Sequence, residues 1–473
     1  MITAHVNEIG IVLRFDSPRD NFAPEAWEAL LDELKSQHIP SFYQHGKRMY
    51  IEASPEGKLK AVIYFTPQTV TMEEAINILK KRNIKVFDVR ETGQNNISKF
   101  ESMSVRGFRR LCDVDMELRP LTVLIGANGT GKTSLLDVFS LLANSAQGAL
   151  NKAISDSSGL PALITYDRKK DLVLGVSMDL GTPETLDYLL RIKPQGASYT
   201  IEEEHLSRAR PGDISIQYLV AEGSRVEYDM GPLRPTWEHN PLETALSQVP
   251  KMLKEPEDFR RKLASTTFYH VLNVEPRSPV RLPQPMRPAS LPGKDGEDLV
   301  SCLFDLRETE RNRFEAIEDA LRAAFPAFER LDFPPVAAGT LAMTWKDKNL
   351  SKPLYMHQLS EGMLRFLWLA TLLGSPGLTA VTLLDEPEVS LHPELLSLLA
   401  GLLREAAHRT QLVVATHSDR LVRFLKPEEV VVIDSTEDGM ARLTWADQLD
   451  LDEWLKEYTL DEVWRMGRMG GRA

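Results

Sequence analysis

Two patterns of apolar and polar positions recur along the chain. Three short apolar runs, rich in β-branched residues, predict buried strands at Leu121–Ile125, Ala380–Leu384 and Leu412–Thr416. Two further segments, Ser134–Phe139 and Leu364–Leu373, repeat their apolar residues at helical spacing. Strands interleaved with helices in this way predict an α/β fold with a mixed sheet and flanking helices.

Residues 1–95 have a pattern of their own and predict a small, separate α+β domain. Its segments follow the order β-α-β-β-α-β, which matches the ferredoxin-like arrangement. A unit of this kind binds a partner or another copy of its own chain more often than it performs chemistry. The predicted strands are Ile9–Phe15, Arg48–Ala53, Leu59–Phe65 and Lys85–Val89, and the predicted helices are Pro24–Gln37 and Thr71–Arg82.

The rest of the chain predicts one larger domain over residues 96–445 and a C-terminal helical tail over 446–473 that packs on it. Strands and helices alternate from 143 to 336, and the absence of sustained heptads favours a globular insert around 143–340 over a coiled coil. The predicted elements are a hairpin over Phe100–Leu118, strands at Leu172–Met178 and Ile214–Val220, helices at Pro256–Leu263 and Arg307–Phe325, and an extended loop over Pro279–Pro292.

Composition bounds the class of protein without identifying it. A chain of 473 residues is long enough for two or three domains. With 56 basic and 68 acidic residues the net charge is −12, which disfavours indiscriminate binding to nucleic acid but leaves room for a local basic groove. Two cysteines indicate a reducing compartment, and no signal peptide is apparent, so we expect a cytoplasmic protein. The apolar region Phe366–Leu384 is interrupted by Gly374–Gly377 and does not predict a membrane span.

The segment Gly126–Thr133 fits G-x-x-x-x-G-K-[ST], the phosphate-binding P-loop, between a predicted strand and a predicted helix. Its glycines let the backbone curl around a phosphate, and the helix N-terminus adds partial positive charge. We expect Lys132 to reach the β- and γ-phosphates and the Thr133 hydroxyl to ligate Mg²⁺. The predicted nucleotide contacts are Gly126, Asn128, Gly129, Thr130, Gly131, Lys132, Thr133 and Ser134.

The run Ala380–Leu384 leads into two carboxylates, Asp385 and Glu386. In P-loop enzymes an acidic residue at such a strand end holds Mg²⁺, and a second one can orient or deprotonate the attacking water. We expect Asp385 in the first role and Glu386 in the second, with Lys132 also counted as catalytic. Without further motifs, a strand that merely ends in an acidic turn would be equally plausible.

Three further motifs accompany the carboxylates: Leu359–Met363, Ser390–Pro393 and His417 at the end of a strand. Together with the P-loop they resemble an ABC-type ATPase of the RecF and SMC branch, over residues 96–473. The motif sequences are most similar to those of stand-alone bacterial AAA-family ATPases, which are relatives of the OLD-type ATPases. These sequences are Asp-Glu-Pro-Glu-Val-Ser-Leu-His-Pro and, further along the chain, Ala-Thr-His-Ser.

The resemblance implies how the site works. Leu359–Met363 would be the signature motif, and its Ser360 and Gly362 would contact the nucleotide held by the P-loop of a second, head-to-tail copy. His417 would contact the γ-phosphate and act in catalysis with Glu386. ATP and Mg²⁺ are the expected cofactors, because Asn151-Lys152 lacks the aspartate of a guanine signature.

The sequence leaves the roles of several further residues undecided. The strand glutamine expected between P-loop and signature has two weak candidates, Gln147 and Gln217. The pair Arg109-Arg110 either contacts the base or ribose or is a solvated charge pair, the latter being favoured. Asp450 and Asp452 have the spacing of metal ligands, but an acidic amphipathic segment is the favoured interpretation. The small basic clusters, which either lie on a solvated surface or line a groove, are Arg168–Lys170, Arg260–Lys262 and the terminal Arg465, Arg468 and Arg472.

Three functions are consistent with the motifs. The leading hypothesis is an ATPase that acts as a dimeric switch or clamp with a separate effector protein, in bacterial defence against phage or mobile DNA. We expect no Toprim nuclease domain, because too few residues follow His417. The alternatives are a RecF-like repair clamp with duplex DNA as its partner, and a scaffold that ATP holds together without hydrolysis. Glu386 argues against the scaffold, which has no need of a catalytic base.

Overall fold

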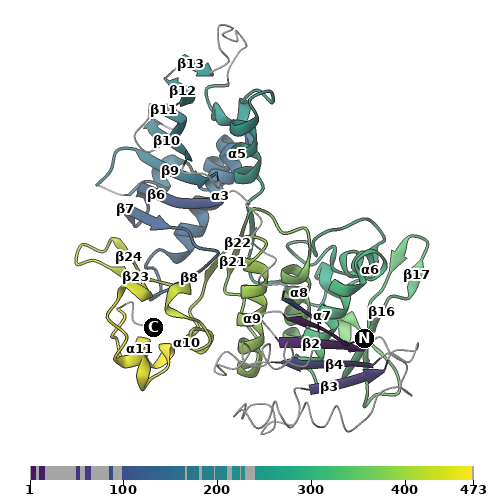
Figure 1. Ribbon diagram of the computed structural model, residues 1–473. Coiled ribbons are helices and arrows are strands. Elements are labelled where there is room, and N and C mark those ends of the chain that lie inside the picture. The colour runs from purple at the N-terminus through teal and green to yellow at the C-terminus, as the bar shows by residue number, and fades with distance from the viewer. Residues whose placement is uncertain are drawn as a thin grey trace. The chain divides into compact units, whose positions relative to one another are not determined.

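The computed structural model describes five strands before residue 99, and residues 99–470 apart from 166–167, 181–183, 197, 210–215, 224 and 229–239. The chain divides into two compact units (Figure 1). Unit 1 comprises Met1–Gln94, Leu272–Leu378 and Glu388–Arg409; unit 2 comprises Asn95–Val271, Thr379–Pro387 and Thr410–Ala473.

Unit 2 contains a six-stranded sheet in the order β14-β21-β22-β8-β23-β24. The first five strands are parallel, and the edge strand β24 is antiparallel. The central strands are fully buried apolar runs, as expected for a parallel sheet covered on both faces. The strands are β14 (Thr267–Tyr269), β21 (Val381–Asp385), β22 (Gln411–Ala415), β8 (Leu121–Ile125), β23 (Val430–Ser435) and β24 (Ala441–Trp445).

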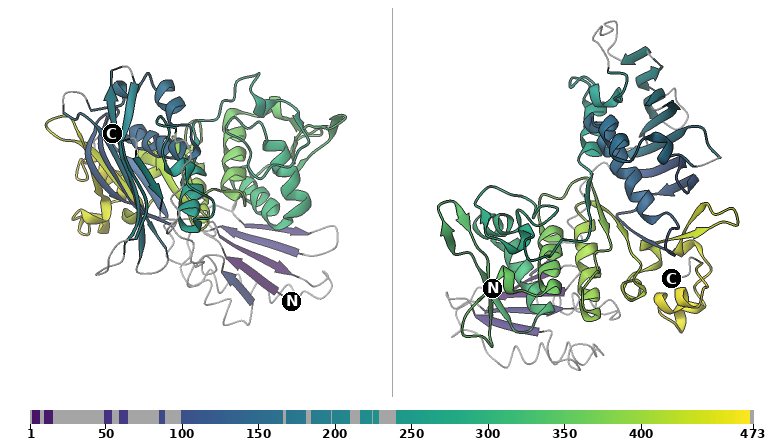
Figure 2. Two further views of the ribbon diagram at one scale, coloured as in Figure 1. Left: turned by 90° about the horizontal axis from the view of Figure 1, so that it is seen from above. Right: turned by 180° about the vertical axis from the view of Figure 1, so that it is seen from behind.

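A second, antiparallel sheet of seven strands belongs to the same unit, in the order β13-β12-β11-β10-β9-β6-β7. Figure 2 shows its blue and teal strands side by side. Helices α3 (Lys132–Gln147) and α5 (Lys254–Ala264) share one apolar core with it. The strands are β6 (Phe100–Phe108), β7 (Leu111–Glu117), β9 (Leu172–Asp179), β10 (Thr185–Gln195), β11 (Ser198–Ala209), β12 (Ile216–Glu222) and β13 (Arg225–Tyr228).

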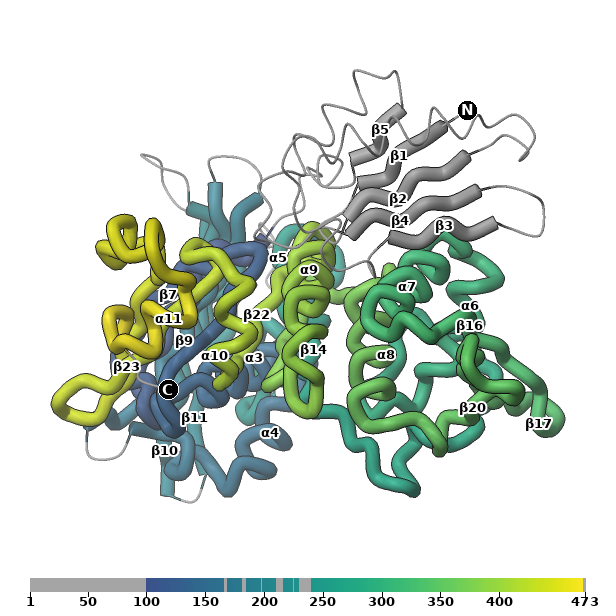
Figure 3. The backbone as a smooth tube through the Cα atoms, turned by 90° about the horizontal axis from the view of Figure 1, so that it is seen from below, coloured from purple at the N-terminus to yellow at the C-terminus, as the bar shows by residue number. Residues whose placement is uncertain are grey.

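Unit 1 is built around α8, in which the run from Phe366 to Leu373 is buried and, apart from Thr371, apolar. Figure 3 shows α6, α7 and α8 packed together, and the buried Trp345 contacts Phe325, Phe328 and the neighbouring core. The helices are α6 (Leu299–Thr309), α7 (Arg311–Ala324), α8 (Glu361–Gly374) and α9 (Leu396–Ala407). Two small sheets complete it: β15 (Gln284–Pro285), β18 (Thr340–Leu341) and β17 (Pro335–Ala337); β16 (Phe328–Asp332), β19 (Thr344–Asp347) and β20 (Leu354–Tyr355).

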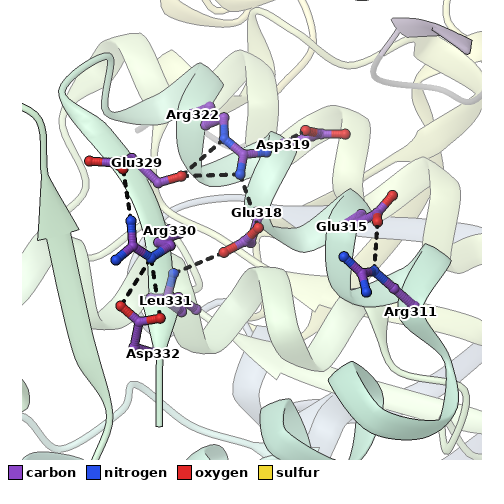
Figure 4. Close-up of polar contacts among 9 residues, drawn as sticks. All are labelled: Arg311, Glu315, Glu318, Asp319, Arg322, Glu329, Arg330, Leu331 and Asp332. Atoms are coloured by element: carbon purple, nitrogen blue, oxygen red, sulfur yellow. Dashed lines mark hydrogen bonds and ion pairs between the residues drawn. The ribbon is translucent and has the colours of Figure 1, made fainter. Parts of the chain in front are cut away.

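A buried ionic network attaches α7 to β16 (Figure 4). Arg322 donates to Glu318 at 2.9 Å and to Asp319 at 2.8 Å, and all three side chains are at most 10% exposed. Glu318 also accepts the backbone N–H of Leu331 at 2.8 Å, and Arg322 donates to the carbonyl of Glu329. Every charge in this interior position therefore has a partner, which is the condition for burying it.

Five strands before residue 99 form one sheet in the order β3-β4-β2-β1-β5. This sheet has one strand more than the predicted ferredoxin-like pattern, because Ile2–Val6 pairs with both β2 and β5. The predicted helices Pro24–Gln37 and Thr71–Arg82 lie outside the described residues, so the ferredoxin-like domain stays a prediction. The strands are β1 (Ile2–Val6), β2 (Gly10–Phe15), β3 (Met49–Ala53), β4 (Leu59–Tyr64) and β5 (Lys85–Asp88).

Two sequence expectations between 143 and 336 are wrong. Strands and helices do not alternate there: after a short helix over Leu150–Asp156, β9 to β13 follow one another as an antiparallel meander, and α5, α6 and α7 come after it. The single helix predicted over Arg307–Phe325 is two helices, α6 and α7. They meet at Glu310, whose φ of −130° and ψ of 59° interrupt the helical conformation. Charged residues at helical spacing continue through this break, so the pattern did not mark it.

The remaining elements are short. The expected loop over Pro279–Pro292 contains one 3₁₀ turn, Pro279–Arg281, and strand β15. Helices α4 (Leu150–Asp156), α10 (Asp419–Val422) and α11 (Leu460–Arg465) complete the α-helices of the described residues. None of the described helices is both long and apolar enough to cross a membrane. Cys112 and Cys302 are both free thiols.

Candidate functional site

The P-loop lies between β8 and α3, as predicted, and its backbone requires glycine. Gly126, Gly129 and Gly131 have φ of 151°, 76° and 120°, a region that residues with a Cβ rarely adopt. A Cβ on Gly126 would lie 2.2 Å from the carbonyl oxygen of Ile433, so no other residue fits there. Among the described residues, no atom outside the adjacent residues lies within 4 Å of a Cβ built on Gly129, so this side of the loop is open.

Lys132 is the first residue of α3 and is 4% exposed. Its ammonium donates to the carbonyls of Gly126 at 2.6 Å and Ala127 at 2.8 Å. Burial lowers its pKa to about 8, opposed by the nearby carboxylates of Glu386 and Asp385. A buried cation bonded only to neutral carbonyls gains much from an anion, which is what a phosphate would supply.

The carboxylates follow β21 at the carboxyl edge of the sheet. Asp385 lies opposite Ala415 of β22, which in turn lies opposite Leu124 of β8. The backbone N–H of Glu386 donates to the carbonyl of Ala415 at 2.8 Å. Three parallel strands therefore end side by side, and their end residues meet where open α/β sheets bind ligands.

His417 comes two residues after β22 and faces Glu386, with 3.6 Å between Nε2 and Oε1. Both side chains are more than a third exposed. Burial of the ring and the nearby Lys132 ammonium lower the pKa of His417, opposed by Glu386. A neutral imidazole at this position can both donate and accept a hydrogen bond.

The carboxylates provide a suitable place for a divalent cation. Burial raises the pKa of Asp385, and the negative charges of Glu386 and Asp137 raise it further, opposed by His270 and Lys132. Clustered negative charge of this kind is relieved by a bound cation. Carboxylate and hydroxyl oxygens are the ligands that Mg²⁺ prefers, so Asp385 and Thr133 fit the predicted site.

Sequence reasoning missed His270, which follows β14. Because β14 is parallel to β21 with Tyr269 opposite Leu384, His270 lies beside Asp385, with 3.9 Å between Nδ1 and Oδ2. The sequence does contain a strand signal, Thr266-Thr267-Phe268-Tyr269. Nothing in it shows which strand this one pairs with. The two glutamine candidates do not take the position: Gln147 ends α3 and donates to the carbonyl of Ala264, and Gln217 lies on β12.

Arg109 has a partner that the sequence did not reveal. Its guanidinium pairs with Asp137 of α3 at 2.5 Å, and both side chains are about one-third exposed. Leu111, the first residue of β7 after this turn, lies 3.3 Å from the position of a Cβ built on Gly131 of the P-loop. The ion pair links the β6–β7 turn to the P-loop helix, and its partial exposure agrees with the favoured expectation of a solvated charge.

The predicted signature residues Ser360 and Gly362 belong to unit 1. Ser360 is the N-cap of α8, and its side chain accepts the backbone N–H of Met363 at 3.3 Å, as expected for a cap. A Cβ on Gly362 would lie 3.0 Å from the carbonyl of Ser390. Arg365 donates to the Ser390 hydroxyl at 2.8 Å, which joins α8 to the Ser390–Pro393 segment. The roles of Ser360 and Gly362 stay predictions.

Most arginines of the predicted basic clusters are paired with acidic residues. Arg168 pairs with Asp438, Arg260 with Glu257 and Arg261 with Asp258. These ion pairs lower the positive potential that a nucleic-acid groove needs. Within the part of the chain that the structure describes, no group of three His, Cys, Asp or Glu could hold a metal, which includes the Asp450 and Asp452 region.

Comparisons with known proteins give a family, a relative and several solved structures. Residues 121–423 match the family described as "AAA domain, putative AbiEii toxin, Type IV TA system". The OLD nuclease of Thermus scotoductus is 23% identical over 394 residues, which cover 78% of this chain and 67% of that protein. An SMC head bound to the C-winged helix domain of ScpA is 16% identical, with 76% of this chain and 99% of that chain covered and a TM-score of 0.46. The SMC head of Thermotoga maritima is 12% identical, with 73% and 98% covered and a TM-score of 0.38.

Proposed function

The chain belongs to the AAA-domain family that its residues 121–423 match, and on that premise we propose that it hydrolyses ATP as a nucleotide-driven dimer. The observation that carries the proposal is the meeting of Lys132, Asp385, Glu386 and His417 at one sheet edge. They come from three separate parts of the chain. A structural role alone gives no reason to gather a buried lysine, two carboxylates and a histidine there.

In this proposal each side chain has one task. Lys132 exchanges its bonds to the loop carbonyls for bonds to the β- and γ-phosphates, and the loop N–H groups complete the phosphate cradle. Thr133 and Asp385 would hold Mg²⁺, and the bound cation would supply positive charge against the phosphates. Glu386, fixed by its backbone bond to Ala415, orients the attacking water and accepts its proton on a carboxylate oxygen. His417 hydrogen-bonds the γ-phosphate.

The second copy contributes Ser360 and Gly362 in this proposal. They stand at the N-terminus of α8, where free N–H groups and partial positive charge favour a phosphate. ATP would then be held by Lys132 of one chain and Ser360 of the other. Hydrolysis removes the phosphate that both chains hold, so the two nucleotide states differ in contacts and the dimer loosens.

The proposed biological role is a cytoplasmic switch that controls a separate effector protein in defence against phage or mobile DNA. The family description names a toxin of a type IV toxin–antitoxin system, and the relative is a nuclease of the OLD type, which support such a role. In this proposal residues 1–95 form the partner-binding or self-binding domain. The residues 96–445 are the ATPase domain and 446–473 its tail.

Replacement of the proposed base tests hydrolysis directly. We predict that Glu386→Gln lowers the rate of Mg²⁺·ATP hydrolysis by about 10²- to 10⁴-fold, because the carboxylate no longer accepts the proton. ATP binding persists, and the ATP-bound dimer accumulates in size-exclusion chromatography with light scattering. Glu437→Gln, on the exposed β23–β24 turn, is the matched control and keeps wild-type activity.

The same preparations separate the alternatives. Absence of ATP-dependent assembly in both proteins contradicts the dimer mechanism. Full biological function of Glu386→Gln would favour the ATP-stabilised scaffold. Tight, salt-sensitive binding of duplex DNA in the ATP state would favour the RecF-like clamp. The ion pairs of Arg168, Arg260 and Arg261 count against this alternative.

A further inference from the structure

We propose that His270 is a nitrogen ligand of the divalent cation at the nucleotide site, and that it makes the site favour cations softer than Mg²⁺. The inference rests on the proposed nucleotide site, but it does not depend on hydrolysis. It concerns the imidazole of His270 and the carboxylate of Asp385, which is assigned to the cation above.

The pairing of two short strands fixes the position of His270. Thr267, Phe268 and Tyr269 lie opposite Thr382, Leu383 and Leu384, so the next residue on each strand is His270 and Asp385. Parallel strands end at the same edge of a sheet, and the two side chains are therefore neighbours whatever their rotamers. This is a consequence of backbone register.

The ring of His270 is held against Phe268, with 4.0 Å between the ring centroids. Phe268 is 8% exposed and belongs to the core, so the contact restricts the histidine. The His270 side chain is nonetheless 66% exposed and accessible to an incoming cation. A ligand that is already oriented loses little freedom on binding.

The distance between His270 and Asp385 fits a shared cation better than a direct bond. Nδ1 and Oδ2 are 3.9 Å apart, which exceeds the length of a hydrogen bond. Two ligand atoms that each lie about 2.1 Å from one cation can be up to about 4.2 Å apart. An ion pair with a side chain as exposed as that of His270 would stabilise the fold by only about 0–1 kcal/mol, so stability alone gives little reason for the pairing.

The donor atoms decide which cation is favoured. Mg²⁺ binds oxygen ligands almost exclusively, whereas imidazole suits transition metals. His270 lies beside Asp385, so the donor set proposed above, Asp385 and Thr133, gains one nitrogen among its oxygens. Mn²⁺ and Co²⁺ accept such a set more readily than Mg²⁺, so the nucleotide-bound protein should prefer them.

Pulsed electron paramagnetic resonance of Mn²⁺ tests the ligand. We expect wild-type protein with Mn²⁺ and a non-hydrolysable ATP analogue to show hyperfine coupling to an imidazole nitrogen, and His270→Gln to lose it. The dissociation constant of Mn²⁺ should rise by about 10- to 100-fold in His270→Gln, while that of Mg²⁺ changes less. His205→Gln is the matched control, because His205 pairs with Glu203 on β11.

The possible outcomes distinguish this inference from the proposed function. Binding of the analogue and Mn²⁺ with the same nitrogen coupling in wild type and His270→Gln overturns the inference alone. Absence of any analogue or Mn²⁺ binding to the wild type overturns both. Binding of the analogue to His270→Gln in the presence of EDTA shows that the variant is folded, so a lost coupling then reports the ligand.

Discussion

Glu386 has the most constrained backbone among the proposed site residues. Its φ of 49° lies in the left-handed region, which non-glycine residues adopt at a cost. The bond from its N–H to the Ala415 carbonyl holds it there. Strain of this kind persists where the surrounding structure over-determines a residue, and it is common at active sites. The backbone of Glu386 is therefore held by the neighbouring strand of the sheet.

The pKa of Lys132, about 8, predicts how nucleotide affinity depends on pH. Bound phosphates favour the charged ammonium, so binding raises this pKa. The affinity for nucleotide is then highest below pH 8, where Lys132 of the free protein is already charged, and it falls as the pH rises through 8. We expect a decrease of about tenfold per pH unit above 8. Isothermal titration calorimetry with a non-hydrolysable ATP analogue from about pH 7 to about pH 9.5 measures this affinity.

The variant Lys132→Arg serves as the control for this titration. Its guanidinium stays charged throughout the pH range, so its affinity, although weaker, should not vary with pH. An equally steep decrease in Lys132→Arg would assign the pH dependence to another group.

At the scale of elements, helix α8 is held at both ends by side chains from other segments. Before its N-terminus, Arg281 donates to the carbonyl of Leu359 at 2.9 Å. After its C-terminus, Arg409 donates to the carbonyl of Ser375 at 2.7 Å, and burial lowers the pKa of Arg409 to about 10. The bond from Arg409 satisfies a carbonyl that the C-terminal end of a helix leaves free, and the bond from Arg281 holds the residue that precedes the N-cap. Ser360 therefore stands at the start of a rigidly held element.

The ionic network of α7 predicts a large stability effect in unit 1 (Figure 4). Arg322→Ala removes the guanidinium that pairs with the buried carboxylates of Glu318 and Asp319, and should destabilise the fold by about 3–5 kcal/mol. Arg311→Ala removes a neighbouring i,i+4 pair from the same helix, but Arg311 is 80% exposed. That loss should be about 0.3–0.5 kcal/mol. Urea unfolding followed by circular dichroism compares them, and equal midpoints would contradict the buried network.

At the scale of the whole molecule, a shared site predicts that two inactive variants restore each other. Lys132→Ala removes the phosphate contact of one chain, and Ser360→Arg blocks the contact of the other. In a head-to-tail heterodimer both changes fall in one site and the other site is intact. An equimolar mixture should recover about a quarter of wild-type ATPase activity if the chains exchange at random.

Each variant measured alone, at the same total protein concentration, is the control for the mixture. Recovery shows that Lys132 and Ser360 act across two chains. A mixture no more active than its components would mean that each chain uses its own pair, or that Ser360 has no part in the site.

Much of the candidate site could be predicted from local sequence. The P-loop, the strand ending in Asp385 and Glu386, and the Ser360 cap each depend on residues within one strand, turn or helix. The break at Glu310 was missed, although it is local, because helical periodicity of charge continues across it. Strand order in the meander could not be predicted, since alternation marks a strand but not its neighbours.

The sequence by itself determined that this protein has a phosphate-binding loop, a carboxylate pair and a capped helix bearing Ser360. Only the tertiary structure decided that His270 lies beside Asp385 and that Arg109 pairs with Asp137. The physical reason is how far apart in the sequence the residues lie that determine each feature. Turns, caps and strand ends are set by adjacent residues, whereas the neighbours of a strand are chosen by packing among segments far apart in the chain.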